Sequence, residues 1–223
     1  MHSNWNLGLC LGTLATLWSG GASALPILSE LYYDAVGSDD GESFVEIYGT
    51  PGTSLEGFAI DGINGSNGAV GPTILLSGTI GASGLFVVAD RRTDGTSSVL
   101  GADLLANFDF QNGPDSVVLR QGATTLDGLG YGVFGAGEIN AGEGTPAAAV
   151  SPGSSLARRF ANVDTNDNAA DFVALATPTP GSAPLSVVPE PGSALLLGLG
   201  LAGLARASRP RSGLAGGMAA SAL

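Results

Sequence analysis

The sequence predicts an all-β fold, an antiparallel sandwich of short strands built as one domain. Residues 25–187 show no convincing helical periodicity and contain nine short runs rich in β-branched, aromatic or alternating apolar residues. The runs are separated by dipeptides typical of turns, namely Asp61-Gly62, Asn64-Gly65, Asn67-Gly68, Asn112-Gly113 and Asp127-Gly128. Eight or nine strands with such loops indicate a sandwich, although their spacing leaves the strand order open.

The expected strands are residues 27–33, 43–48, 55–60, 73–76, 85–89, 116–120, 126–131, 155–160 and 172–175. The clearest alternation lies in 43–48, where Phe44, Glu46 and Tyr48 share one face and Val45 and Ile47 share the other. The Gly-rich stretch 128–144 lacks lysine and no helix follows it, so we interpret it as a loop rather than as a phosphate-binding loop.

Composition narrows the chemistry that the chain can perform. Hydrophobic residues make up 44% of the 223 residues and charged residues 13%, which is typical of a folded protein. His2 and Cys10 are the only residues of their kinds, and lysine is absent. If the first segment is removed, histidine-based catalysis, lysine Schiff bases, histidine or thiolate zinc sites and disulfides are excluded. The net charge of -12 argues against nucleic-acid binding, which requires a basic surface.

The first 24 residues have the pattern of an export signal. An apolar run at 7–18 is too short to span a bilayer, and the small residues Ala22-Ser23-Ala24 follow it. We expect cleavage between Ala24 and Leu25. The segment departs from the usual pattern in having no lysine or arginine before the apolar run, and a buried N-terminal helix is the alternative.

The C-terminal segment has three parts in a fixed order. The sequence Pro189-Glu190-Pro191 is followed by an apolar run at 193–205 and then by an arginine cluster, Arg206, Arg209 and Arg211. This pattern resembles the PEP-CTERM sorting signal, which implies recognition by an exosortase in the inner membrane of a Gram-negative bacterium.

The tail has the physical properties of a transient membrane segment. Thirteen apolar residues are fewer than the ~20 that a stable transmembrane helix needs, so transient insertion is expected. The arginines would stay on the cytoplasmic side. A plain tail anchor is the alternative, and residues 212–223 extend beyond where such signals usually end.

A second resemblance covers residues 26–183. Its first half is carried by Ile27-x-x-Glu30-Leu31-x-Tyr33-Asp34, Phe44-Val45-Glu46-Ile47-Tyr48 and Leu55-x-Gly57-Phe58-x-Ile60. Its second half is carried by Asn107-Phe108-Asp109-Phe110, Asp115-Ser116-Val117-Val118-Leu119, Asp127-x-Leu129-Gly130-Tyr131-Gly132, Ser154-Ser155-Leu156-Ala157-Arg158 and Thr177-Pro178-Thr179-Pro180-Gly181. In this order the segments resemble a bacterial lamin-tail domain. The resemblance implies an immunoglobulin-like sandwich that acts as a binding or interaction module, with no shared catalytic residues.

Six carboxylates gather around the loop between the first two expected strands. They are Glu30, Asp34, Asp39, Asp40, Glu42 and Glu46. Because calcium takes six to eight oxygen ligands, they form a candidate calcium site, and calcium is the one cofactor that the sequence indicates. The alternative is that Asp and Gly are present because turns favour them.

A second acidic segment is interpreted differently. Asp164, Asn166 and Asn168 have the spacing of the first EF-hand ligands, but Ala169 replaces the required glycine and Leu175 the bidentate glutamate. We therefore expect Asx turns before the last strand. A glycoside hydrolase with paired carboxylates is a further hypothesis, but the part between the two terminal signals has no tryptophan to line a sugar cleft.

Together these observations divide the chain into a signal peptide (1–24), a lamin-tail-like sandwich (25–183), a linker (184–188), a sorting segment (189–211) and a tail of unknown role (212–223). We expect an exported, non-catalytic module at the cell envelope or in the extracellular matrix. Its expected partners are the exosortase and, through the family resemblance, exopolysaccharide or matrix proteins. A calcium-dependent structural or adhesive module and a carboxylate glycosidase are the alternatives.

Overall fold

Ten strands and one short helix form the part of the chain that the computed structural model describes, residues 24–186, 199–201 and 204. The strands are β1 (Ile27–Tyr32), β2 (Phe44–Tyr48), β3 (Phe58–Asn64), β4 (Val70–Leu75), β5 (Leu85–Asp90), β6 (Leu104–Ala106), β7 (Asp115–Gln121), β8 (Thr124–Tyr131), β9 (Ser155–Arg158) and β10 (Phe172–Leu175), and the helix is α1 (Asn168–Asp171). The predicted all-β class is confirmed.

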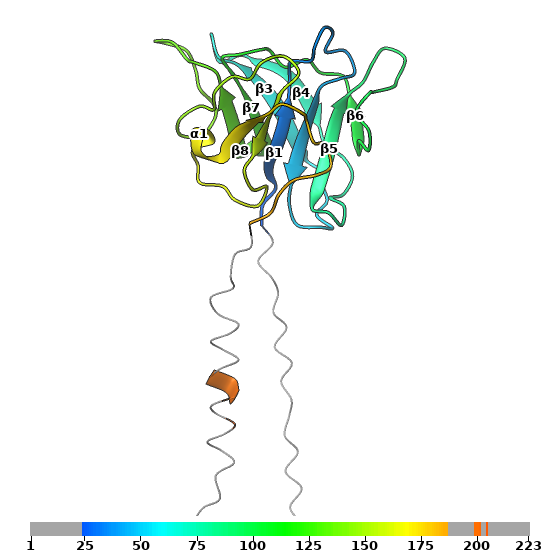
Figure 1. Cartoon of the computed structure of the whole chain (residues 1–223), viewed down its shortest axis with the longest axis vertical. Coiled ribbons are helices and arrows are strands. Elements are labelled where there is room, and N and C mark those ends of the chain that lie inside the picture. Colours follow the sequence, from blue (N-terminus) through cyan, green and yellow to red (C-terminus); the bar gives the residue numbers. More distant parts are fainter. Residues whose placement is uncertain (1–23, 187–198, 202–203, 205–223) are drawn as a thin grey trace, which may run out of the picture. The chain divides into compact units, whose positions relative to one another are not determined.

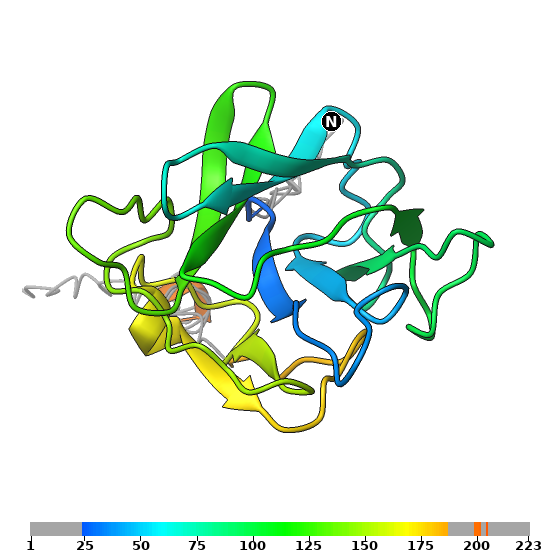
Figure 2. The same cartoon turned by 90° about the horizontal axis from the view of Figure 1, so that it is seen from above.

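The strands form two sheets that pack as a sandwich (Figure 1). The larger sheet has the order β10-β9-β1-β2-β5-β6, and the smaller one has the order β4-β3-β7-β8. In Figure 2 the β7–β8 hairpin lies in the upper part of the view and β9 and β10 lie in the lower part. All pairs are antiparallel except β5–β6, which is parallel. The antiparallel sandwich is therefore confirmed, with one parallel pair at an edge.

The core lies between the sheets, where the inward residues of both pack together. Val45 and Ile47 of β2 are fully buried in it, as the alternation in 43–48 predicts. The opposite face of β2 is also covered, because Phe44 packs with Val87 in a second apolar cluster and Glu46 is 0% exposed. A strand in the middle of the larger sheet is thus buried on both faces, and one of its buried residues is a glutamate.

Nine of the ten strands overlap predicted runs, although the bounds of some, such as β3 and β4, differ by several residues. The exception is β6, which has only three residues and therefore too little alternation to be recognised. Two predicted turns are wrong, because Asp61-Gly62 lies inside β3 and Asp127-Gly128 lies inside β8. At both places the aspartate accepts hydrogen bonds from an arginine, so its role is tertiary rather than local.

The chain crosses the larger sheet once more after β10. We call residues 177–185 the strap. Its end and the start of β1 lie at the same end of the sandwich (Figure 1). The chain divides into two compact units between Leu185 and Ser186, close to the predicted end of the domain. Ala24 and Leu25, the predicted cleavage position, are exposed, and the rest of the predicted signal lies outside the described residues.

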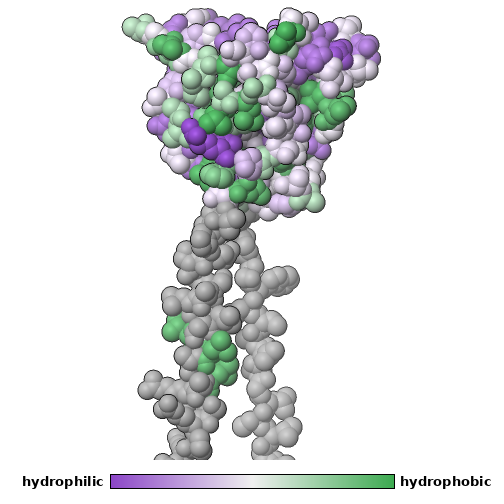
Figure 3. Space-filling view, viewed as in Figure 1, coloured by the Kyte–Doolittle hydropathy of each residue, from purple (hydrophilic) through white to green (hydrophobic). Residues whose placement is uncertain are grey.

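The surface of the sandwich mixes hydrophilic and hydrophobic residues over the face shown in Figure 3. Single exposed apolar side chains such as Val36, Leu75 and Val133 are ordinary for a folded domain. The buried carboxylates are more informative about function, because they form the candidate functional sites.

Candidate functional site

Part of the predicted calcium loop lines an acidic cavity of about 330 Å³. Asp39 and Asp40 contribute to it from the loop, and Asp90 and Asp109 contribute from the larger sheet and the segment after β6. Asp90 holds these segments together. Its Oδ2 accepts the Gly41 N–H over 2.7 Å, and its Oδ1 accepts the Phe108 N–H over 3.1 Å.

The electrostatics of this acidic cavity favour a cation. None of the described residues that line it carries a positive charge. Desolvation raises the pKa of Asp109, and the charges of Asp39 and Asp90 raise it further. Desolvation followed by the charge of Asp39 also raises the pKa of Asp34. A bound cation would relieve this repulsion, and carboxylate oxygens are the ligands that calcium prefers.

The other four predicted ligands do not line this cavity, and Asp34 is one of them. Glu42 forms an ion pair with Arg92, with 2.5 Å between Glu42 Oε1 and Arg92 Nη2. Glu30 and Glu46 point to the face of the larger sheet that the strap covers. The structure therefore brings Asp39 and Asp40 together with two carboxylates that the sequence analysis did not include. The pairing of β2 with β5 places Asp90 beside the loop, and that pairing cannot be read from local sequence.

Glu30 and Glu46 form a second buried acidic site. They are opposite each other on β1 and β2, and they are 2% and 0% exposed. Glu30 accepts hydrogen bonds from Ser155 Oγ (2.5 Å), Thr179 N (2.9 Å) and Thr179 Oγ1 (2.7 Å). Glu46 accepts from Ser29 Oγ (2.8 Å) and Gly181 N (2.6 Å). The pair thus fastens the strap to the sheet.

No arginine is among the hydrogen-bond donors to Glu30 and Glu46, so no hydrogen-bonded cation stabilises their charged forms. Desolvation raises the pKa of Glu46 to about 7, and the nearby charges of Glu30 and Asp103 act in the same direction. The hydrogen bonds from Ser29 and Gly181 oppose the shift. Glu46 is therefore partly protonated at neutral pH.

A third acidic site surrounds Arg158, whose side chain is fully buried. Its Nη2 donates to both oxygens of Asp127 over 2.9 and 2.8 Å, and its Nη1 donates to Asp171 over 2.7 Å and to Asp164 over 3.3 Å. Its Nε donates to the Leu28 carbonyl over 2.7 Å. Charge-assisted hydrogen bonds of this kind are about twice as strong as those between neutral groups.

The segment that carries Glu143 is brought to this centre by glycines and by Asn168. A Cβ on Gly142 would lie 2.0 Å from the Gly130 nitrogen, so only glycine allows this contact with β8. The side chain of Asn168 donates to the Gly128 carbonyl and accepts from the N–H groups of Gly130 and Glu143. The first part of the Gly-rich stretch 128–144 belongs to β8, in agreement with the strand predicted at 126–131.

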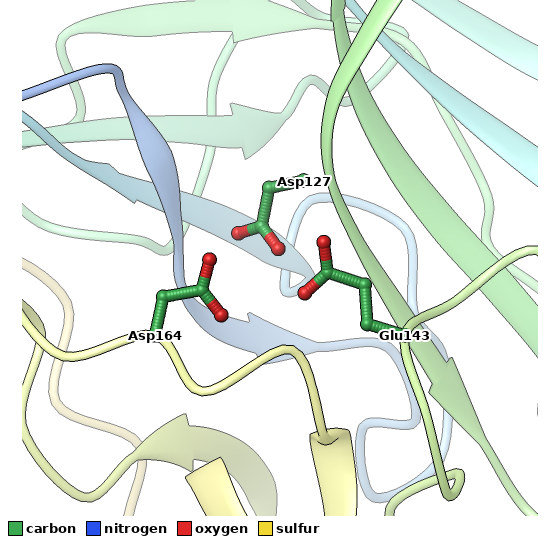
Figure 4. Close-up of side chains that lie close together, drawn as sticks. All are labelled: Asp127, Glu143 and Asp164. Carbon is green, nitrogen blue, oxygen red and sulfur yellow. The ribbon is translucent and has the colours of Figure 1, made fainter.

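Asp127, Glu143 and Asp164 offer carboxylate oxygens that lie within 4.8 Å of one another (Figure 4). Such a group could hold a metal ion, but two of its members, Asp127 and Asp164, already pair with the Arg158 guanidinium. Desolvation followed by the charges of Asp127 and Asp164 raises the pKa of Glu143 to about 8. Its buried Oε2 has no hydrogen-bond partner in the described structure. The Arg158 guanidinium therefore balances part of the negative charge, and the raised pKa of Glu143 favours its protonated form.

The second acidic segment has the local structure predicted for it. Asp164 Oδ1 accepts the Asn166 N–H over 3.1 Å, which forms an Asx turn. Asp167 caps α1 by accepting from the N–H groups of Ala169 and Ala170. The long-range partner of Asp164, Arg158, cannot be read from the local sequence. The sequence signal for a buried ion pair was Arg158, because it is a charged residue inside a predicted strand.

Comparisons with known proteins identify the tail. A family model described as the PEP-CTERM protein-sorting motif matches residues 187–211. The predicted sorting signal is thereby confirmed, and the matched range contains Pro189, Glu190, Pro191 and the arginine cluster. No curated protein and no solved structure matches the chain, and no lamin-tail family model matches the sandwich.

The motif identifies the class of protein to which the chain belongs. It is an exported protein that an exosortase recognises, and it is sorted to the cell envelope or surface of a Gram-negative bacterium. No helix within the described residues is long and apolar enough to cross a membrane. The predicted membrane segment lies outside these residues except for 199–201 and 204, which are helical.

Proposed function

We propose that the chain is a non-catalytic binding or interaction module of the lamin-tail type, delivered to the envelope or the extracellular matrix by its sorting signal. The observation that carries the proposal is the PEP-CTERM motif, which follows directly on a folded β-sandwich. The strand segments that carry the lamin-tail resemblance form β1 to β3 and β7 to β9, which supports the same assignment. Exopolysaccharide and matrix proteins are the proposed partners.

Processing of the tail tests the sorting part of this proposal. In the native host, intact-mass measurement and cell fractionation of the wild-type protein should show a shortened chain outside the inner membrane. Replacement of Pro189, Glu190 and Pro191 by alanine should leave the full-length chain in the membrane fraction, whereas Glu56→Ala, on the sandwich surface, should be processed normally. Native material that keeps residues 193–205 would contradict the proposal.

The non-catalytic part is tested by activity. Purified protein should not hydrolyse envelope polysaccharides. Turnover that a single Asp→Ala or Glu→Ala change abolishes would contradict this part and would favour a carboxylate glycosidase.

A calcium-dependent structural or adhesive module is the second candidate, and the acidic cavity around Asp39 and Asp109 favours it. Because a ligand that binds only the native state stabilises it, millimolar calcium should raise the melting temperature. Asp39→Asn with Asp109→Asn should remove that increase, and Glu56→Gln should not. A melting temperature that is the same with calcium and with chelator would exclude this candidate.

A further inference from the structure

A separate cavity of about 260 Å³ lies at one end of the smaller sheet. It is bounded by β3, the edge strand β4, the segment before β7 and the end of β8. The register of β3 and β4 shifts between Asp61 and Ile63, and Pro72 lies in β4 opposite this shift. A register shift and a proline at an edge strand interrupt regular pairing there. The residues that line it include Asn64, Pro72, Phe110, Gln111, Asp115 and Tyr131.

The floor of this cavity is aromatic and firmly held. Asn64, Asp115 and Tyr131 are directly opposite one another on β3, β7 and β8, so they share one face of the sheet. Tyr131 is 1% exposed and stacks on Tyr33, with 4.4 Å between the ring centroids. Phe110 is 2% exposed. The cavity therefore combines a preformed apolar floor with polar groups at its rim.

Asp115 has an oxygen that the protein leaves unused. The residue is only 6% exposed, and its Oδ1 accepts the Gly65 N–H over 2.5 Å. Among the described residues no donor reaches Oδ2. Asp115 lines both this cavity and an adjoining one of about 240 Å³. Oδ2 is not among the buried atoms that lack a partner, so it is accessible and can accept a hydrogen bond from a ligand.

Gln111, which also lines this cavity, offers donors. The Asn64 side-chain amide donates to Gln111 Oε1 over 2.7 Å, and Tyr131 Oη donates to the Gln111 carbonyl over 2.7 Å. These bonds orient Gln111, and its side-chain NH₂ has no acceptor within the described residues. The lining of the cavity thus presents an acceptor at Asp115 and donors at Gln111.

The charge and size of the cavity narrow the ligand class. Asp109 and Asp115 are the only ionisable acids among the described lining residues, and no arginine lines the cavity, so anions are repelled. The volume lies just below the ~300 Å³ at which pockets for drug-sized ligands begin, which suits a single ring. We propose that this cavity binds a neutral sugar ring, with its C–H face against Phe110 and Pro72 and its hydroxyls on Asp115 Oδ2 and the Gln111 amide.

The proposal deepens the binding role proposed above, and it is tested on the full chain by saturation-transfer NMR. The probes are the methyl glycosides of glucose, galactose and mannose, with glucuronate and spermidine as charged comparators. We expect at least one neutral glycoside to bind in the millimolar range and glucuronate not to bind. A Cβ on Gly71 would meet only the Gly62 carbonyl oxygen, at 3.6 Å, so Gly71→Leu should fold normally, fill the cavity and abolish binding.

Two exposed glutamines provide a matched pair of variants. Gln111→Ala should weaken binding about five- to tenfold through the loss of one or two hydrogen bonds, whereas Gln121→Ala at the far end of β7 should not change it. Absence of neutral glycoside binding at tens of millimolar, binding of spermidine alone, or binding that survives Gly71→Leu would each overturn the proposal. Correct sorting without sugar binding would overturn only this inference, and sugar binding without sorting would overturn only the sorting role.

Discussion

Two regions of the sandwich bury carboxylates, and they neutralise them by different means. Around Arg158, the carboxylates of Asp127 and Asp171 accept hydrogen bonds from one guanidinium. Under the strap, Glu30 and Glu46 accept only from hydroxyls and backbone N–H groups, and Glu46 has a pKa raised to about 7. The first region therefore depends on an ion pair, and the second depends on neutral donors and a proton. The two should respond differently to mutation, pH and salt.

The largest expected effect follows from removing Arg158. Arg158→Ala leaves Asp127 and Asp171 buried without their positive partner, and breaking a buried pair in this way costs about 3–5 kcal/mol. Urea unfolding of the purified protein measures the difference. Arg159→Ala is the matched control, since Arg159 is exposed and its guanidinium makes one bond to a backbone carbonyl. Equal stabilities of the two variants would show that the guanidinium does not stabilise this end of the sandwich.

The second effect is a dependence of stability on pH that originates under the strap. With a folded pKa of about 7 against an ordinary 4.5, Glu46 binds more protons in the native state than in the unfolded state between these values. The free energy of unfolding should therefore fall by about 3 kcal/mol as the pH rises from 4.5 to 7. Glu46→Gln should remove that part of the slope, and Glu56→Gln on the surface should not.

Glu143 contributes a slope of the same sign, because its pKa is raised to about 8. The double variant Glu46→Gln with Glu143→Gln should therefore be less dependent on pH than either single variant. If Glu46→Gln unfolds with the wild-type pH profile, neutral donors alone hold the buried pair and no proton is involved.

A smaller effect is expected at the strap itself. Thr179→Val removes the hydroxyl that donates to Glu30 but keeps the backbone bond, so a loss of about 1–2 kcal/mol is expected. Thr177→Val is the control, because Thr177 is exposed. Limited proteolysis should cut the strap faster in the Thr179 variant. Equal cleavage rates would mean that the Glu30 bonds do not hold the strap.

The strands could be predicted from the sequence because the signals for a strand are local. Alternation and turn residues are properties of neighbouring positions, and nine strands could be located from them. The errors occur where a residue forms a hydrogen bond with a partner that is distant in the sequence. Asp61 and Asp127 have the appearance of turn residues, yet they lie in strands and accept from Arg120 and Arg158.

The candidate sites were predictable only in part for the same reason. Asp39 and Asp40 could be singled out from the loop, but Asp90 joins them only because β2 pairs with β5, and Asp109 only because β6 pairs with β5. Similarly, 31 residues separate Arg158 from Asp127 in the chain, so no spacing rule connects them. Strand order decides which carboxylates meet, and the spacing of the strands leaves that order open.

The smallest effect is expected at the exposed ion pair of Arg92 and Glu42, and it completes the comparison. Their side chains are 29% and 41% exposed, so solvent and salt screen the attraction, and Glu42→Gln should cost about 0.2–1 kcal/mol. Molar salt, where the screening length is about 3 Å, should abolish this difference. The same salt should leave the Arg158→Ala difference nearly unchanged, because no solvent reaches that guanidinium. If salt reduces both differences equally, Arg158 is accessible to ions and the distinction between the two kinds of pairing fails.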